Sequence, residues 1–414
     1  MTRNMPKLRL LTAAAAFVLS GLAHAGDISV NLAFKGANQR AFWESTIAAF
    51  QKANPDVKVK AAFIEEEAYK VQLPGWLTSE APDVIKWHEG ERIRYYAQRG
   101  LLEDLSADWQ KNGWDKSYAA LADASSFNGK KYSLPTDYFS WGVFYRKDLF
   151  AKAGIKGEPA TWEEFLDACK KLKAAGIAPI TVGGRDSWTL AVWFDYLNMR
   201  INGHAFHMQL MNGEIAYTDA RVKKVYQAWQ TLIDNKYFIE APLSYSLDSA
   251  QPLMTQGKAA MMLMGTFISG GLPEAARAHT GYFRFPVVDP KVALAEDGST
   301  DCLNIPARAK NKTDARRFLA FVSSAEVNAR LAQTFGSLPA NNQAAIPEDP
   351  YAKAGLAILT NSPGGIAQFY DRDMNKEMAD EGMKGMQRFM SDPAKLDDIL
   401  ARMEAARKRI YRKS

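Results

Sequence analysis

Apolar residues alternate with polar or small residues over 28–34, which predicts a β-strand because successive side chains of a strand point to opposite faces. A helical stretch follows and is ended by Asn54-Pro55, and a second strand is predicted over 57–63. After another helical stretch, a third strand is predicted over 83–87. This alternation predicts a parallel sheet with right-handed crossovers, in which ligands bind beyond the carboxyl ends of the strands.

The same alternation of strands and helices begins again farther along the chain. Thr161 is placed to cap a helix through Ala174, with Glu164 three residues later as its capping-box partner. A strand over 180–182, an amphipathic helix over 219–234 and a fully apolar strand over 259–264 are then predicted. A chain of this length is more than one hydrophobic core usually holds, so we expect two domains.

Two proline-bearing segments indicate passages between these domains. Near Pro135 a turn is followed by an aromatic cluster, Tyr138, Phe139 and Trp141, and then by a buried strand over 143–145. A second passage is expected in the segment 283–288, which contains Pro286.

The first 25 residues have the pattern of a secretory signal peptide. Basic residues precede a short apolar run over 10–22, which ends in the small-residue site Ala23-His24-Ala25. Cleavage there removes three positive charges, so the formal charge falls from +6 to 6 − 3 = +3. Because Cys169 and Cys302 lie far from this site, no lipid anchor is expected, and the predicted location is the periplasm.

Composition and motifs argue against several functions. The middle of the chain has no basic stripe interleaved with aromatics, so nucleic-acid binding is not expected. The sequence has no Gly-x-Ser-x-Gly, no phosphate-binding glycine loop and no His-Glu-x-x-His, and His204 and His207 lack a third ligand, so no metal or cofactor is expected. Acidic clusters at Glu65 to Glu67 and at Asp371 and Asp373 leave a secreted glycoside hydrolase as the alternative from another class.

Several short segments, collinear over nearly the whole chain, carry a resemblance to a known family. They are Pro82–Ile85 with Trp87, Gly100–Leu105, Asn128–Ile155, Thr161–Phe165, Gly257–Met262 with Gly265–Phe267, Ile305–Ala307 with Lys310–Lys312, and Leu338–Ala340. The chain resembles the bacterial extracellular solute-binding proteins of family 1, the maltose-binding-protein-like receptors of ABC sugar importers.

The resemblance implies an α/β fold with two lobes, each a parallel-rich sheet flanked by helices, and a ligand cleft at the hinge. The expected organisation is a signal peptide at 1–25, a first lobe from 26–135 and 286–340, and a second lobe from 136–285 and 341–414. It also implies a monomeric receptor, not an enzyme, whose partners are a small sugar ligand and the membrane permease subunits of an ABC importer, with no nucleic acid.

Candidate ligand-binding residues follow from strand ends and from the resemblance. Trp87 ends a predicted strand, where a ligand would lie. The resemblance adds an acid–arginine pair, taken as Glu91 and Arg92, with Glu89 as the other choice for the acid. It also implies contacts from the residues Lys35, Asn38, Trp188, Gly265, Thr266 and Phe267. Tyr138 or Phe139 would present a ring from the hinge side, and Asp301, an acid beside the expected second passage, is a candidate acceptor for hydroxyl groups.

These residue types suit a neutral sugar. Aromatic rings cover the apolar faces of pyranose rings, and carboxylates accept hydrogen bonds from hydroxyl groups. Glu91 and Asp301 would repel a phosphate, which disfavours the glycerol phosphates that some members of the family bind. The number of aromatics indicates a sugar of two or three units.

Overall fold

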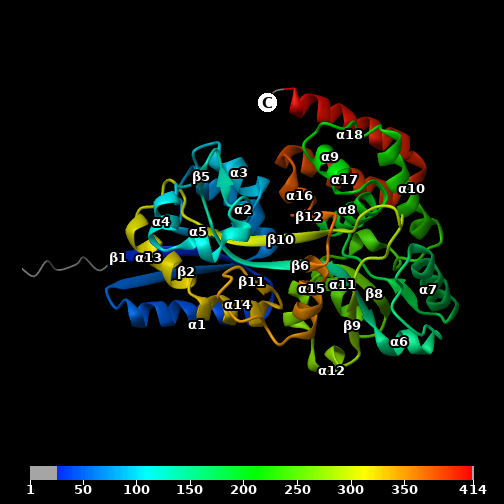
Figure 1. Cartoon of the computed structure of the whole chain (residues 1–414), viewed down its shortest axis with the longest axis horizontal. Coiled ribbons are helices and arrows are strands. Elements are labelled where there is room, and N and C mark those ends of the chain that lie inside the picture. Colours follow the sequence, from blue (N-terminus) through cyan, green and yellow to red (C-terminus); the bar gives the residue numbers. More distant parts are fainter. Residues whose placement is uncertain (1–25, 413–414) are drawn as a thin grey trace, which may run out of the picture.

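The computed structural model describes residues 26–412, so the predicted signal peptide at 1–25 lies outside the described residues. Figure 1 shows two lobes joined through the middle of the molecule by β6 (Leu134–Arg146) and β10 (Ala295–Asn304). Both strands belong to one ten-stranded sheet, whose main path has the order β2-β1-β3-β10-β6-β8-β7.

The first lobe contains the parallel part of this sheet at the amino-terminal end of the chain. Here β1 (Gly26–Phe34) pairs in parallel with both β2 (Val57–Glu65) and β3 (Val84–His88). The strand β10 then adds antiparallel to β3. A short hairpin of β4 (Ser126–Phe127) and β5 (Lys130–Lys131) lies apart from the main sheet.

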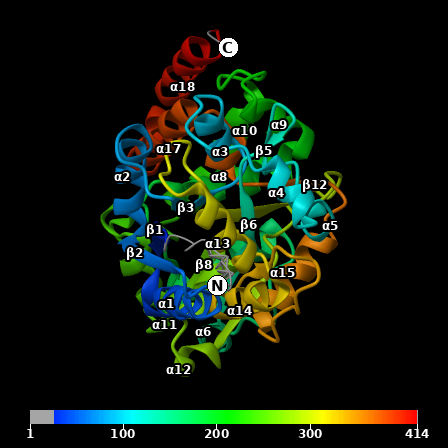
Figure 2. The same ribbon diagram turned by 90° about the vertical axis from the view of Figure 1, so that its left-hand side faces the viewer.

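Helices from two distant parts of the sequence cover this lobe. They are α1 (Gly36–Ala53), α2 (Glu66–Thr78), α3 (Glu91–Ala97), α4 (Ser106–Lys111), α5 (Trp114–Ser117), α13 (Lys312–Val322) and α14 (Ala325–Phe335), with the 3-10 turn η1 (Ala119–Leu121). Figure 2 shows α1 and α14 side by side below the sheet. In the core between them and α13, Phe50 and Phe318 meet edge to face with centroids 5.2 Å apart.

The second lobe contains the other end of the sheet. The strand β6 pairs antiparallel with β8 (Ala259–Gly265) and β9 (Thr280–Phe283), and β7 (Ala178–Ile180) pairs in parallel with β8. The short strands β11 (Leu338–Pro339) and β12 (Gly365–Ala367) pair with β6 and β10, respectively.

A larger set of helices encloses the core of the second lobe. They are α6 (Lys147–Lys152), α7 (Trp162–Ala174), α8 (Trp188–Asn202), α9 (His204–Met211), α10 (Ala220–Asp234), α11 (Leu247–Thr255), α12 (Glu274–Arg277), α15 (Pro350–Thr360), α16 (Tyr370–Asp373), α17 (Lys376–Ser391) and α18 (Leu396–Tyr411), with η2 (Pro242–Ser244), η3 (Thr266–Gly271) and η4 (Pro393–Lys395). The predicted capping box of Thr161 and Glu164 is present at the start of α7. The predicted strand over 180–182 is found two residues earlier, as β7.

The two connecting strands run antiparallel to each other across the boundary. Asp301 of β10 lies opposite Asp137 of β6, and the register shifts between Asp301 and Cys302. Near Pro286 the chain still lies against the second lobe, since Val287 exchanges backbone hydrogen bonds with Ala160 and Trp162. We therefore propose that the second passage is made by β10 itself, and the lobe ranges expected from the sequence stay a proposal.

Among residues 26–412, no helix is both long enough and apolar enough to cross a bilayer. Cys169 and Cys302 are free and buried, and they lie in different hydrophobic clusters.

Candidate functional site

A cleft between the lobes opens into three adjoining chambers, and Lys35 lines all three. The inner chamber has a volume of about 20 Å³, which is room for about one water molecule. Its lining residues come from both lobes and are Lys35, Lys70, His88, Phe139, Trp141, Trp188, Phe267, Phe369, Asp371 and Arg372. The two outer chambers measure about 270 and 260 Å³.

Aromatic rings form most of the wall of the inner chamber. Trp141 lies at their centre and stacks on Phe369, with centroids 4.5 Å apart and planes 5° apart. The rings of Phe267 and Trp188 meet Trp141 edge to face at 5.8 and 6.3 Å. Phe139 lies two residues before Trp141 on β6, so both side chains point to the same face of the strand. The result is an apolar surface that spans strand, helix and loop.

The backbone of Phe369 is held in an unusual conformation. Its φ of 144° lies in a region that side chains other than glycine rarely adopt. The Asp373 carboxylate accepts hydrogen bonds from the backbone N–H groups of Gln368 and Phe369, at 2.7 and 3.2 Å. The Asp195 carboxylate accepts one from the N–H of Tyr370 at 2.7 Å. These bonds fix the segment that carries the ring into the chamber.

A charged network forms the polar side of the chamber, with His88 at its centre. Its Nδ1 lies 2.9 Å from Asp301 and its Nε2 lies 3.1 Å from Glu66. Asp301 also pairs with Lys86 at 2.7 Å and with Arg372 at 3.1 Å. Burial by itself would raise the pKa of Asp301, but the nearby Lys86, His88 and Arg372 hold it well below its usual range. Asp301 therefore stays ionised at neutral pH.

Lys35 is the cation of the cleft that has no carboxylate within ion-pairing distance among the described residues. Its ammonium group lies 4.5 Å from the ring centre of Phe267 and 5.4 Å from that of Trp188. Burial lowers its pKa, while the charge of Glu66 opposes that shift. Its N–H donors are thus available to a ligand at the point where the three chambers meet.

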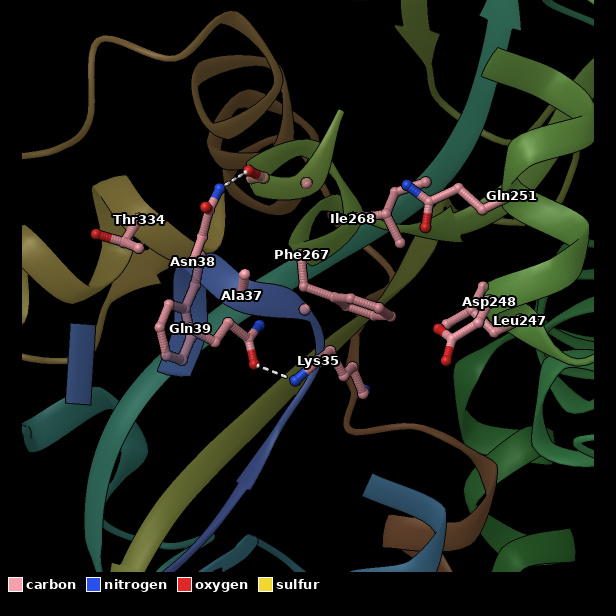
Figure 3. A pocket seen from close by; sticks show the side chains of 14 residues that line it. Lys35, Ala37, Asn38, Gln39, Leu247, Asp248, Gln251, Phe267, Ile268 and Thr334 are labelled. Atoms are coloured by element: carbon pink, nitrogen blue, oxygen red, sulfur yellow. Dashed lines mark hydrogen bonds between the residues drawn. The ribbon is translucent and has the colours of Figure 1, made fainter. Parts of the chain in front are cut away.

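The first outer chamber has amide and carboxylate groups on its rim (Figure 3). Gln39 accepts a hydrogen bond from the backbone N–H of Lys35 at 2.9 Å, and Asn38 donates one across the cleft to the carbonyl of Gly270 at 3.0 Å. Asp248 and Gln251 of α11 face them from the second lobe.

The second outer chamber is acidic. It is lined by Lys35, Glu65, Glu66, Glu67, Arg185, Asp186, Trp188, Ser246, Leu247 and Asp248. The indole N–H of Trp188 donates to Glu67 across the cleft at 3.1 Å, and Lys70 pairs with the same carboxylate at 2.8 Å. Glu65 to Glu67, one of the two acidic clusters noted in the sequence, therefore border the cleft, and Glu66 is buried.

Some of the ligand-binding residues predicted from the sequence lie together at the inner chamber. Lys35, Phe139, Trp188 and Phe267 line it, and Asp301 reaches it through His88. Asn38 lines the neighbouring outer chamber. A Cβ added at Gly265 would lie 2.5 Å from the Phe267 ring, while Thr266 is buried beside these residues.

The other predicted residues lie away from the chamber walls. Trp87 is 4% exposed and packs between Tyr69 and Tyr96 in the first lobe. Tyr138 points to the opposite face of β6, against Leu338 and Ala352. Both predicted choices for the acid have protein partners. They are Glu89, which is fully buried and accepts hydrogen bonds from Ser125 and Ser133, and Glu91, which pairs with Arg94 at 3.0 Å.

Sequence reasoning missed Lys70, His88, Trp141, Asp371 and Arg372 as lining residues. The period of two along β6 would have placed Trp141 beside Phe139. His88 directly follows Trp87, and a strand end was already expected there. Asp371 and Arg372 come from the late segment of the chain, whose return to the cleft no local pattern indicates.

Among the described residues, no group of three or more His, Cys, Asp or Glu side chains is arranged to hold a metal ion.

Comparison with known proteins gives matches over most of the chain. The sequence profile of bacterial extracellular solute-binding proteins matches residues 36–329. A probable sugar-binding periplasmic protein of Mesorhizobium japonicum is 27% identical over 297 residues, covering 68% of this chain and 67% of the relative. An uncharacterised ABC transporter extracellular-binding protein of Pyrococcus horikoshii is 25% identical over 335 residues, covering 79% and 74%.

Among solved structures, the bacterial solute receptor AcbH superposes with a TM-score of 0.87 and 25% identity, covering 94% of this chain and 100% of that one. Its description reports an exclusive preference for β-D-galactopyranose. The superposition confirms the predicted two-lobed α/β fold.

Proposed function

Because the chain belongs to the bacterial extracellular solute-binding proteins, we propose that it is the receptor of an ABC sugar importer. It captures a neutral sugar between its lobes and delivers it to the permease subunits in the membrane. The relatives described as sugar-binding support the ligand class, and the relative described as an ABC transporter protein supports the partner. The receptor acts as a monomer in the periplasm after its signal peptide is removed.

The cleft formed by the three chambers is the observation that carries this proposal. The inner chamber itself has room for about one water molecule, but Trp188 and Phe267 in its wall also line the outer chambers, where their rings offer apolar faces on which a pyranose ring can lie. On the polar side, Lys35 offers hydrogen-bond donors and Glu67 offers acceptors for hydroxyl groups. A site built of rings and hydroxyl-bonding groups suits a sugar.

Charge pairing favours a neutral sugar over an anion. Lys70 is compensated by Glu67, and Arg372 is compensated by Asp301. Of the lysine and arginine side chains among the described residues that line the inner chamber, Lys35 alone is then left for a phosphate to pair with, and the carboxylates beside the other two would repel the phosphate. Since the outer chambers extend the inner one in two directions, a ligand of two or three units has room to continue beyond the rings.

The carboxylates beside the inner chamber act as structural ions and not as catalysts. Burial works to raise the pKa of Asp371, yet Arg92 and Arg372 lower it to about 2. Burial also works to raise the pKa of Glu66, but the charge of Lys35 and the hydrogen bond from His88 outweigh burial and hold this pKa well below its usual range. A glycosidase needs one carboxyl group that keeps its proton beside the scissile bond, and these two acids are ionised.

A thermal-shift screen tests the proposal. The probes are galactose, maltose, raffinose and diacetylchitobiose, with glycerol 3-phosphate as the anionic comparison. A ligand that binds only the folded state raises the melting temperature, so at least one sugar should do so. The bound sugar should be recovered chemically unchanged after incubation. Stabilisation by glycerol 3-phosphate alone, or cleavage of the sugar, would contradict the proposal.

A further inference from the structure

A buried ion pair joins the two lobes beside the inner chamber, which Asp371 helps to line. Arg92, in the first turn of α3, donates from Nη2 to the carboxylate of Asp371 in α16. Both side chains are less than a tenth exposed. Neither outer chamber is lined by either residue, and Arg92 does not line the inner one.

The backbones of the lobes also approach each other closely at this point. Gly90, just before α3, has a φ of 71°. A Cβ placed there would lie 2.4 Å from the carbonyl oxygen of Arg372, so only glycine allows this approach. The Arg372 side chain reaches back into the first lobe, where it donates to the carbonyl of Thr300 at 2.6 Å and lies 3.0 Å from Nδ1 of His88.

We propose that Gly90, Arg92, Asp371 and Arg372 form a latch that sets the closed angle of the lobes, and that Arg92 and Asp371 are positioning residues which bind each other and not the sugar. This inference rests on the proposed function, because closing on a ligand is what such a latch would serve. It gives Arg92 a role different from the sugar contact that the family resemblance implied.

The surroundings of Arg92 support a structural role. Its guanidinium lies 5.9 Å from the ring centre of Trp87, and the indole N–H of Trp87 donates to the Arg92 carbonyl at 3.3 Å. Trp87 is itself fixed in the core of the first lobe. Arg92 is therefore held in place on the first lobe, and its charge is paired with Asp371 of the second lobe.

Electrostatics makes the pair sensitive to the loss of either partner. When only one member of a buried ion pair is removed, the other stays buried without compensation, and this costs more than removing both. A direct sugar contact behaves differently, since the loss from Arg92 would then be the same whether or not Asp371 is present.

This difference defines the experiment. Sugar affinity is measured by calorimetry for the wild type, Arg92→Gln, Asp371→Asn and the double variant, using whichever of galactose, maltose, raffinose or diacetylchitobiose binds the wild type. The latch predicts that each single variant binds about tenfold more weakly or worse, and that the double variant binds more tightly than either. Arg99→Gln is the matched control, because Arg99 lies just beyond α3 and its guanidinium donates to the carbonyl of Tyr95 and lies over the ring of the same residue, within the first lobe.

A second readout does not depend on a sugar. Spin labels at Val71→Cys on α2 and Lys384→Cys on α17 report the distance between the lobes, and both positions are exposed whereas Cys169 and Cys302 are buried. Without sugar, Arg92→Gln should shift the distance distribution toward longer values. If no sugar binds the wild type but this shift occurs, the proposed function fails and the latch stands. Additive losses of affinity, with a double variant no better than Arg92→Gln and unchanged distances, would overturn the latch.

Discussion

Trp141 and Phe369 stack face to face at the inner end of the cleft, although one lies on a connecting strand and the other in a loop near the carboxyl end of the chain. The stack is one of the contacts by which the late segment is attached to the sheet. In this stack, Phe369 has a positive φ, a backbone conformation that is free of strain only for glycine.

Phe369→Ala and Phe369→Gly should separate the ring from the backbone strain. Loss of the buried ring should lower the free energy of unfolding by about 3–5 kcal/mol in Phe369→Ala. Phe369→Gly loses the same ring but relieves the positive φ, so it should be about 1 kcal/mol more stable than the alanine variant. Urea unfolding measures both. An alanine variant as stable as the glycine variant would show that the strain is not present in solution.

Trp188→Ala should lose sugar affinity, whereas Trp87→Ala should lose stability. Trp188 lines the inner chamber, so its loss should weaken sugar binding by about 1–3 kcal/mol with little change in stability. Trp87 is buried in the first lobe, so its loss should lower stability by about 3–5 kcal/mol. Calorimetry and urea unfolding on both variants check this. Equal losses of affinity with intact stability would place Trp87 at the sugar after all.

Gly90→Ala should hinder closure. The added methyl group would lie 2.4 Å from the Arg372 carbonyl, so binding should weaken by about tenfold or more and the sugar-induced decrease in the radius of gyration should be reduced. Gly100→Ala is the matched control. Gly100 also has a positive φ, of 65°, but a Cβ there meets nothing within 4 Å. It should cost about 1 kcal/mol of stability and leave sugar affinity unchanged. Identical scattering changes in both variants would contradict close approach at Gly90.

Glu89 should make stability depend on pH. Burial raises its pKa to about 7 from 4.5, although hydrogen bonds from Ser133 and Ser125 oppose the shift. Between these two values the folded state keeps a proton that the unfolded state has lost, so the free energy of unfolding falls as the pH rises, by at most about 1.4 kcal/mol per pH unit.

Glu89→Gln removes this titration. Relative to the wild type, its free energy of unfolding should therefore rise by about 3 kcal/mol between about pH 4.5 and about pH 7. Unfolding in urea across this range measures the difference, and Glu163→Gln on the exposed side of α7 is the control. A constant difference between variant and wild type would mean that Glu89 titrates normally.

Local patterns in the sequence predicted elements but not how distant segments meet. The capping box at Thr161 and the strands at 28–34 and 259–264 were readable because each depends on neighbouring residues. The position of β10 as a central strand that spans both lobes was not readable, because its ten residues are largely acidic and polar and yet are buried along their whole length. Buried polar strands lack the apolar signal on which strand prediction depends.

The same distinction applies to the candidate site. Strand ends and the family resemblance supplied Lys35, Phe139, Trp188 and Phe267. What they could not supply was the partner of each charged group. Arg92 and Glu89 have the residue types of sugar-binding groups, but their partners Asp371 and Ser133 lie far away in the sequence.

The first lobe is assembled from two distant parts of the chain, and this sets a time for its completion. The parallel part of its sheet is complete with β3, by residue 88, but Phe318, which packs against Phe50, is made 318 − 88 = 230 residues later. At about 5–20 residues per second of synthesis, this delay is about 10–50 s. During that interval the amino-terminal segment has an exposed apolar face and no complete core. A newly made chain with this connectivity therefore cannot complete the core of its first lobe until about three quarters of its 414 residues have been synthesised.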